Sequence, residues 1–321
     1  MTENSHLKIH NNIINNSPET IHRFSHKAMA TIFEIFIIHE DSRYAGQAAH
    51  SAFCEVDRLE QELSRFIENS DISRINRFGA VKSVSLGLDT FECLEQCAEL
   101  HKKTGGAFDI TVGPLLKCWL NSDKTLRFPS EEEIAYSHKH IGMNLVRLNK
   151  KQHAVKLKIN DMCLDLGAFG KGYAVDKAAE VLNEWDIATA VIHGGMSSVL
   201  ALNAPPGEKG WHVTVSNPKD YQQDISHFYL QNRAVSGSGL RKGQHIINPK
   251  TAQPVTERIA AWAVTPTAAI GDAYSTAFMI MPLDEIRDFC LNNPDIQAII
   301  VNEGTEGKSE IVHIGELGYF E

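Results

Sequence analysis

The segment that decides the fold reads DLGAFGKGYAVD and occupies residues 165–176. Residues 163–166, which are apolar except for Asp165, lead into three glycines, and apolar side chains then recur at helical spacing, at Val175, Ala178, Leu182 and Trp185. We therefore expect a short strand, a glycine turn and a helix. Glycines let the backbone approach a ligand, and a helix N-terminus with Lys171 beside it suits a phosphate group. The alternative is a tight structural turn, because the spacing matches neither common phosphate-binding glycine motif.

Periodicity extends these expectations along the chain. Strands are expected at residues 29–38, 188–192, 199–202, 211–216, 244–247, 259–266 and 296–301, with a hairpin over 145–159. Helices are expected over 43–66, 89–104 and 272–281, and Asp89 with Glu92 is expected to form a capping box. The polar stretch 121–137 is expected to be a surface excursion. Strands mixed with helices and hairpins predict an α+β fold.

The composition is that of an ordinary globular chain of 321 residues with a net charge of −9. This acidic balance argues against non-specific nucleic-acid binding, which needs Lys and Arg at phosphates. No run of about 18 apolar residues predicts a membrane span, and the polar start lacks the pattern of a signal peptide. We expect a cytoplasmic protein with reduced cysteines and a flexible tail over residues 1–22. Residues 23–321 are expected to form a single domain, either one body or two lobes.

A carboxylate and a hydroxyl are spaced four residues apart in the segment GDAYST (residues 271–276). On a helix, Asp272 and Thr276 share one face. Their oxygens suit a hard cation such as Mg²⁺. The alternative is that Asp272 only caps the helix and Thr276 bonds back to a carbonyl.

Three further positions could face a cleft. His245, at an expected strand end before an Asn-Pro turn, has the residue type of a general base near neutral pH. Gly194 and Gly195 form a turn between two strands, and Ser236 begins another glycine-rich turn. Both turns allow backbone amides to approach a ligand, although ordinary bends remain the alternative.

Taken together and in order, these segments resemble the flavin transferase family, the ApbE-like FAD:protein FMN transferases. The resemblance covers about residues 24–302 and rests on several motifs of this chain. They are MAT at 29–31, GGAFDITVGPL at 105–115, DLGAFGKGYAVD at 165–176, AVSGSG at 234–239, HIINPKTAQP at 245–254 and DAYSTA at 272–277. Any one of them is unspecific, but a joint chance match is very improbable.

The resemblance implies a role for each matching residue. Magnesium would be held by Asp272, Thr276 and the main-chain carbonyl of Ala168. His245 falls on the family's proposed base. The positions that fall where the family contacts FAD are Met29, Phe66, Ala107, Phe108, Asp109, Asp165, Lys171, Gly194, Gly195, Ser236 and Ile246.

The implied fold has mixed, mainly antiparallel sheets with packed helices and an FAD cleft between subregions. The implied activity is Mg²⁺-dependent transfer of FMN from FAD to a Thr or Ser hydroxyl of a target flavoprotein, with release of AMP. In that reaction magnesium would neutralise charge on the pyrophosphate, and positioning would supply most of the rate.

The chain departs from the family pattern at several positions. At the position after the glycine pair the family has an acidic residue, and this chain has Met196. Asn248 replaces the Asp of the family's His-Ile-Ile-Asp-Pro motif. Ala30 and Ala252 stand where the family has glycine, and Lys250 replaces an Arg. These departures leave two alternatives open: an FAD-binding homologue without transferase activity, and a Mg²⁺-dependent FAD pyrophosphatase.

Overall fold

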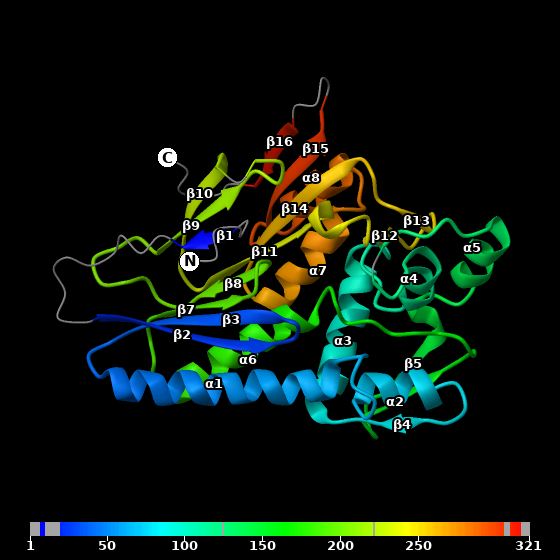
Figure 1. Ribbon diagram of the computed structural model, residues 1–321, viewed down its shortest axis with the longest axis horizontal. Helices are drawn as coiled ribbons and strands as arrows, with labels where there is room; N and C mark the ends of the chain where they lie inside the picture. The colour runs from blue at the N-terminus through cyan, green and yellow to red at the C-terminus, as the bar shows by residue number, and fades with distance from the viewer. Residues whose placement is uncertain (1–6, 10–19, 124, 221, 305–308, 316–321) are drawn as a thin grey trace.

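The computed structural model describes residues 7–9, 20–123, 125–220, 222–304 and 309–315. At its centre is an eight-stranded sheet in which all neighbouring strands are antiparallel (Figure 1). Across the sheet the order is β16 (Ser309–Ile314), β15 (Gln297–Glu303), β14 (Arg258–Thr265), β11 (Arg233–Gly239), β8 (Ser198–Ala201), β7 (Ala190–Gly194), β3 (Thr31–His39) and β2 (Thr20–Ala28).

The two faces of this sheet are covered differently. On one face lie helices α1 (Ser42–Leu63), α6 (Gly170–Glu184) and α7 (Ala268–Phe278), and α8 (Leu283–Asn292) packs beside β15 and β16. A smaller sheet made of β1 (Leu7–Ile9), β9 (Trp211–Ser216) and β10 (Asp224–Leu230) lies on the other side. Buried side chains such as Phe36, Trp211 and Trp262 fill one continuous apolar cluster between the two sheets. The large sheet is thus the middle of three layers.

A second region, at the right of Figure 1, is built from short elements. It contains α2 (Asp71–Phe78), α3 (Leu88–Lys103), α4 (Gly113–Trp119), α5 (Glu131–His138), η1 (Met143–Leu145), β4 (Val84–Ser85), β5 (Val146–Asn149) and β6 (Ala154–Leu157). The later elements η2 (Leu240–Lys242), β12 (Ile247–Asn248) and β13 (Gln253–Pro254) join it to the large sheet. Helices and antiparallel sheets together confirm the predicted α+β class.

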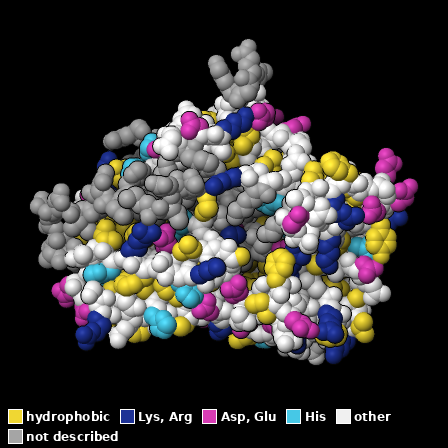
Figure 2. All heavy atoms as spheres, in the orientation of Figure 1, with side chains coloured by type: hydrophobic (Ala, Val, Ile, Leu, Met, Phe, Trp, Pro, Cys, Tyr) yellow, Lys and Arg dark blue, Asp and Glu magenta, His cyan; other side chains and the backbone are white. Residues whose placement is uncertain are grey.

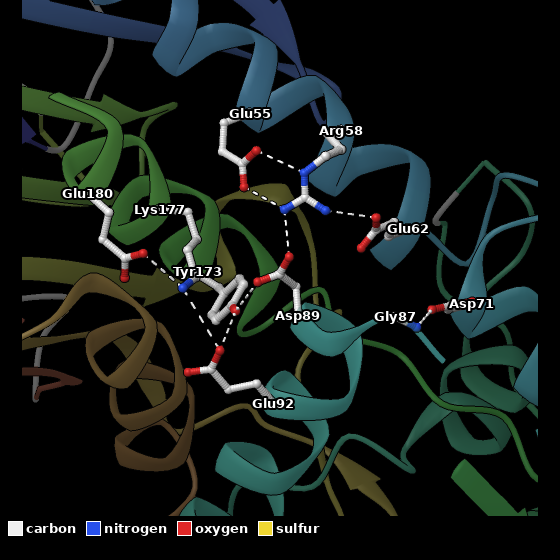
Figure 3. A network of polar contacts seen from close by, with 10 residues as sticks. All are labelled: Glu55, Arg58, Glu62, Asp71, Gly87, Asp89, Glu92, Tyr173, Lys177 and Glu180. Atoms are coloured by element: carbon white, nitrogen blue, oxygen red, sulfur yellow. Dashed lines mark hydrogen bonds and ion pairs between the residues drawn. The ribbon is translucent and has the colours of Figure 1, made fainter. Parts of the chain in front are cut away.

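The predicted capping box at α3 is wrong. The helix begins at Leu88 after Gly87, and no side chain caps it. Figure 3 shows that Asp89 and Glu92 point toward other helices instead. Asp89 accepts from Arg58 of α1 at 2.6 Å, and the Tyr173 hydroxyl of α6 lies 3.1 Å from both Asp89 and Glu92. Tertiary partners have therefore taken the two side chains that the local pattern assigned to the helix end.

Three local expectations also need correction. The strand expected over 29–38 begins only at Thr31, because Met29 and Ala30 form the turn after β2. Residues 163–166 form no strand but a single bridge between Cys163 and Val112. The expected excursion 121–137 contains α5, which begins with a complete capping box of Ser130 and Glu133.

The structure describes two short parts of the expected tail over residues 1–22. Leu7–Ile9 pairs with β9 as strand β1, and residues 20–22 already belong to β2. Backbone pairing, with the distant β9 for residues 7–9 and with the adjacent β3 for residues 20–22, gives these short segments a structure that their polar composition does not predict. The other residues of this stretch lie outside the part that the structure describes.

The turn between β2 and β3 is unusually tight for its sequence. Ala28 pairs with Thr31, so only two residues make the loop, and both have positive φ: 49° at Met29 and 56° at Ala30. A two-residue hairpin with both central residues in the left-handed region is the type I′ turn, which favours glycine. Ala30 therefore carries backbone strain, of about 1 kcal/mol, that a glycine would not.

Replacing Ala30 with glycine should stabilise the protein. We expect Ala30→Gly to raise the free energy of unfolding by about 0.5–1 kcal/mol, because relief of the strained φ outweighs the extra freedom of glycine in the unfolded chain. Chemical denaturation measures the change. Ala252→Gly is the matched control: Ala252 has a φ of 57° but its methyl group is buried, so the two effects should nearly cancel. A less stable Ala30→Gly protein would contradict the strain argument.

Candidate active site

Helices α6 and α7 touch at a glycine. A Cβ added at Gly172 would lie 2.2 Å from the backbone oxygen of Ala268, so only glycine allows this approach. By contrast, a Cβ at Gly170, two residues earlier, would meet nothing closer than 3.8 Å. The close crossing brings the N-terminus of α6 next to the side chains of α7.

Asp272 occupies this crossing. One carboxylate oxygen accepts from the backbone N–H of Gly172 at 2.8 Å, and the other accepts from the Ser198 hydroxyl of β8. Asp272 is 5% exposed and lies in the second turn of α7, whose N-cap is Thr267. The alternative in which Asp272 merely caps its own helix is therefore wrong. Its carboxylate instead faces the glycine segment and β8.

Serines of β11 line the same side of α7. Ser236 and Ser238 share a face of the strand, since side chains two residues apart point the same way. Ser238 bonds to Thr276 at 2.9 Å, and the fully buried Ser236 donates to the Ala268 carbonyl at 3.3 Å. Thr276 thus lies on the face of α7 that carries Asp272, as predicted, whereas the ligand contact assigned to Ser236 stays a prediction.

A second carboxylate adds negative charge nearby. Asp176 of α6 accepts from the backbone N–H groups of Ala268 and Ala269 at 2.7 and 2.9 Å, and so caps α7 from outside. Burial, with a smaller effect from the charge of Asp272, raises the pKa of Asp176 to about 7. Neither carboxylate forms a salt bridge to a Lys, Arg or His of the described chain. The crossing therefore holds negative charge that a bound cation would balance.

The segment 105–109 forms a turn whose last three residues are buried. Ala107 and Phe108 are each 1% exposed, so a ligand would meet mainly their backbone. Asp109 accepts from the backbone N–H and the hydroxyl of Thr111, at 2.7 and 2.6 Å, and its other oxygen lies 3.4 Å from His101 Nδ1. Burial raises the pKa of Asp109, although these hydrogen bonds act against the rise.

Asp165 and Phe66 lie together around an arginine. Arg65 Nε is 2.6 Å from an Asp165 oxygen, and its guanidinium lies 4.4 Å from the centre of the Phe66 ring. Phe66 is 75% exposed. The other oxygen of Asp165 accepts from Gly167 N–H at 2.7 Å, and Lys171 Nζ donates to the Gly167 carbonyl at 3.2 Å. An exposed aromatic ring beside charged groups can stack on a planar ligand.

The β2–β3 turn meets the glycine turn between β7 and β8. Gly195 has a φ of 70°, and a Cβ there would lie 2.3 Å from the Thr31 hydroxyl. Gly194 pairs with Phe33 of β3, and a Cβ on it would lie 2.6 Å from Val175 of α6. Met29 is half-buried at the tip of the neighbouring turn. These glycines thus allow the MAT segment to lie against the start of β8.

His245 lies on a segment that packs on the second region. Its Nδ1 donates to the Gly243 carbonyl at 2.8 Å, so the proton of a neutral ring is on Nδ1 and Nε2 is the basic nitrogen. Ile247 and Ala252 pack with Leu115 of α4, next to the buried Ile246. Asn248 accepts from Lys250 N–H at 2.9 Å and so makes the turn that an aspartate would make.

Several residues of the candidate site were not singled out from the sequence. They are Arg65, Asp176, Ser198 and Ser238. Ser238 could have been found because side chains two residues apart on a strand share a face, and Ser238 follows Ser236 by two. Asp176 could have been found because it is the last residue of the glycine segment DLGAFGKGYAVD. Arg65 and Ser198 have no local signal, because their partners Asp165 and Asp272 lie 100 and 74 residues away along the chain.

Comparison with known proteins gives consistent results. The model of the ApbE family matches residues 29–300. A Buchnera aphidicola (Schizaphis graminum) protein named FAD:protein FMN transferase is 27% identical over 252 residues, 74% of each chain. An Escherichia coli K12 protein of the same name is 23% identical to this chain, and the match covers 88% of this chain and 85% of that protein.

Solved structures give the same result. The flavin transferase ApbE from Vibrio cholerae has a TM-score of 0.82 at 19% identity, over 94% of this chain and 99% of its own. The ApbE protein of Thermotoga maritima has a TM-score of 0.81 at 26% identity, over 92% and 97%. Within the described residues, no helix is both long and apolar enough to cross a membrane.

The helix crossing can be tested by its glycines. We expect Gly172→Ala to lower the free energy of unfolding by about 1–3 kcal/mol and to weaken ligand binding, because the added methyl group forces α6 and α7 apart. Gly170→Ala is the matched control and should be tolerated. Thermal or chemical unfolding measures the first effect and FAD titration the second. Equal behaviour of the two variants would contradict the close approach at Gly172.

Proposed function

The chain belongs to the ApbE family, and from this we propose that it is an FAD:protein FMN transferase. The observation that carries the proposal is the Asp272–Gly172–Ser198 cluster at the crossing of α6 and α7. It joins a buried carboxylate to the glycine segment that would approach the phosphates of FAD. The names of the relatives supply the reaction class, and the cluster supplies groups suited to it.

We propose that Asp272, Thr276 and the carbonyl of Ala168 hold Mg²⁺. The donor set fits, because it consists of oxygen atoms and, among the described residues, no Lys, Arg or His forms an ion pair with Asp272. The described residues contain no cluster of three or more His, Cys, Asp or Glu that could bind a metal. This also suits Mg²⁺, which is commonly held by one or two carboxylates together with substrate phosphates and water. When bound, it would neutralise charge on the pyrophosphate.

The remaining groups would bind and orient the substrates. Phe66 would stack on a ring of FAD, and Lys171 would place its charge near the phosphates. His245 Nε2 would accept the proton of a Thr or Ser hydroxyl on the partner protein. The hydroxyl oxygen would then form a bond to the FMN phosphorus, while the bond from that phosphorus to the AMP oxygen breaks and AMP leaves.

One experiment separates this proposal from its two alternatives. The purified full-length chain is incubated with FAD and a flavoprotein from the same cell, with and without Mg²⁺, and the products are analysed by intact mass spectrometry and chromatography. AMP together with FMN-labelled partner supports the transferase. Free FMN with AMP indicates a pyrophosphatase instead. Bound, uncut FAD indicates a binding protein without turnover.

The metal assignment predicts the effect of removing one charge. Asp272→Asn keeps the size of the side chain but loses the charge, so Mg²⁺-dependent AMP release should fall at least about 100-fold while FAD affinity falls less. AMP release and FAD fluorescence titration give the two values. The exposed Asp284→Asn is the control and should behave like the parent. An Asp272→Asn enzyme with unchanged turnover would exclude Asp272 as a metal ligand.

The base assignment makes a separate prediction. His245→Ala should lower the transfer rate by about 100-fold or more with little effect on FAD affinity, because a positioned general base contributes about 100- to 10,000-fold. The transfer rate is measured from label on the partner protein, and FAD affinity by fluorescence titration. His50→Ala, on the exposed side of α1, is the control. A rate equal to the parent's would show that another group takes the proton.

A further inference from the structure

Two segments of the second region carry positive charge and no negative charge. Residues 72–88 contain three Lys or Arg and residues 139–160 contain six, and neither stretch has an Asp or Glu, although the whole chain has a net charge of −9. Strand β4 of the first segment pairs with β6 of the second, so the fold brings the two segments together. Figure 2 shows dark-blue and yellow side chains beside one another at the lower right, where Figure 1 places α2 and β4.

Four of these positive side chains converge beside the turn that follows α2. Lys156 of β6 donates to the carbonyl of Ala80 in this turn at 2.8 Å, and Lys82 lies two residues further along the turn. Arg147 of β5 lies directly opposite Lys156 in the strand pairing. Lys158 follows Lys156 by two residues and therefore points to the same side of the chain. These four residues, at positions 82, 147, 156 and 158, form what we call the basic surface.

The basic surface lacks internal neutralisation. Its neighbour Arg77 pairs with the exposed Glu68 at 3.7 Å, but among the ion pairs of the described residues none involves a member of the basic surface itself. Like charges that lie opposite one another on neighbouring strands destabilise a sheet. Arg147 and Lys156 therefore repel each other across β5 and β6, and an anionic partner bound at this surface would relieve the repulsion.

Exposed apolar side chains lie in the same turn. Val81, between α2 and β4, is 78% exposed and Phe78 is 37% exposed. The charged groups of Arg77 and Lys82 lie over the Phe78 ring, at 5.1 and 5.4 Å from its centre. Apolar side chains among Lys and Arg suit the boundary of a bilayer, where the cations contact headgroups and the apolar groups reach toward the acyl chains. A nucleic acid would use the charges but leave Val81 in water.

We propose that the basic surface, together with Val81 and Phe78, docks on a bilayer that contains anionic lipids. The four cations would contact lipid phosphate groups, and Val81 would enter the headgroup region. The inference goes beyond the proposed transfer function and does not rest on it, because it concerns a surface outside the Asp272 cluster. The attraction is electrostatic in large part, so binding should weaken as the salt concentration rises.

The test is sedimentation of the full-length chain with vesicles of phosphatidylcholine, either alone or mixed in equal parts with phosphatidylglycerol. The chain should bind the mixed vesicles at least about tenfold more tightly, and high salt should remove the difference. Arg147→Gln/Lys158→Gln should weaken binding to the mixed vesicles about tenfold or more, because each cation near an anionic surface adds to the attraction. Val81→Ser should weaken it about fivefold, because less apolar area leaves water.

Lys27→Gln/Arg43→Gln is the matched control, because it removes the same charge from exposed positions of β2 and α1. It should bind the mixed vesicles like the parent, and the substituted side chains are all exposed, so every variant should unfold at the parent's Tm. Equal binding to the two kinds of vesicle would overturn the proposal. Tighter binding to a DNA duplex than to the mixed vesicles would also overturn it, and so would release from the vesicles by soluble glycerol phosphate, which would assign the surface to a small anion.

Discussion

The close approach of α6 and α7 at Gly172 is the constraint on which the candidate site depends. It lets a backbone N–H at the start of one helix donate directly to a carboxylate on the other, at 2.8 Å. The same crossing lets Asp176 cap α7 in return. Each helix thus satisfies free backbone N–H groups at the N-terminus of the other, which would otherwise need water or a local cap. The contacts that pack the two helices together are therefore also the contacts that form the candidate site.

This arrangement concentrates negative charge in a part of the protein that is poorly solvated. Two carboxylates near each other without a cationic side chain destabilise a fold unless hydrogen bonds or a ligand compensate. Here backbone N–H groups and Ser198 compensate in part, and burial raises the pKa of Asp176 to about 7 although two of those N–H groups act against the rise. Perturbed groups of this kind cluster at functional sites. The charge at the crossing is therefore the feature on which the proposed cation site rests.

The sequence predicted what is encoded locally and missed what depends on distant partners. The glycine segment, the face shared by Asp272 and Thr276, and most strands follow from spacing and periodicity alone. The capping box at Asp89 and Glu92 failed because Arg58 and Tyr173, far away along the chain, offer those carboxylates better partners. Arg65 and Ser198 could not be found for the same reason, since nothing near them in the chain identifies Asp165 or Asp272 as their partner.

The departures from the family pattern are better understood with the structure in view. Ala30 and Ala252 both adopt the left-handed φ for which the family uses glycine. The backbone conformation of the two turns is therefore kept, and each alanine is strained in it. Asn248 keeps the turn through its side-chain oxygen. These three substitutions lie in turns outside the Asp272 cluster. Because turn geometry survives them, they change local stability more than the position of the carboxylate, the hydroxyl and the glycine backbone on which the proposed chemistry depends.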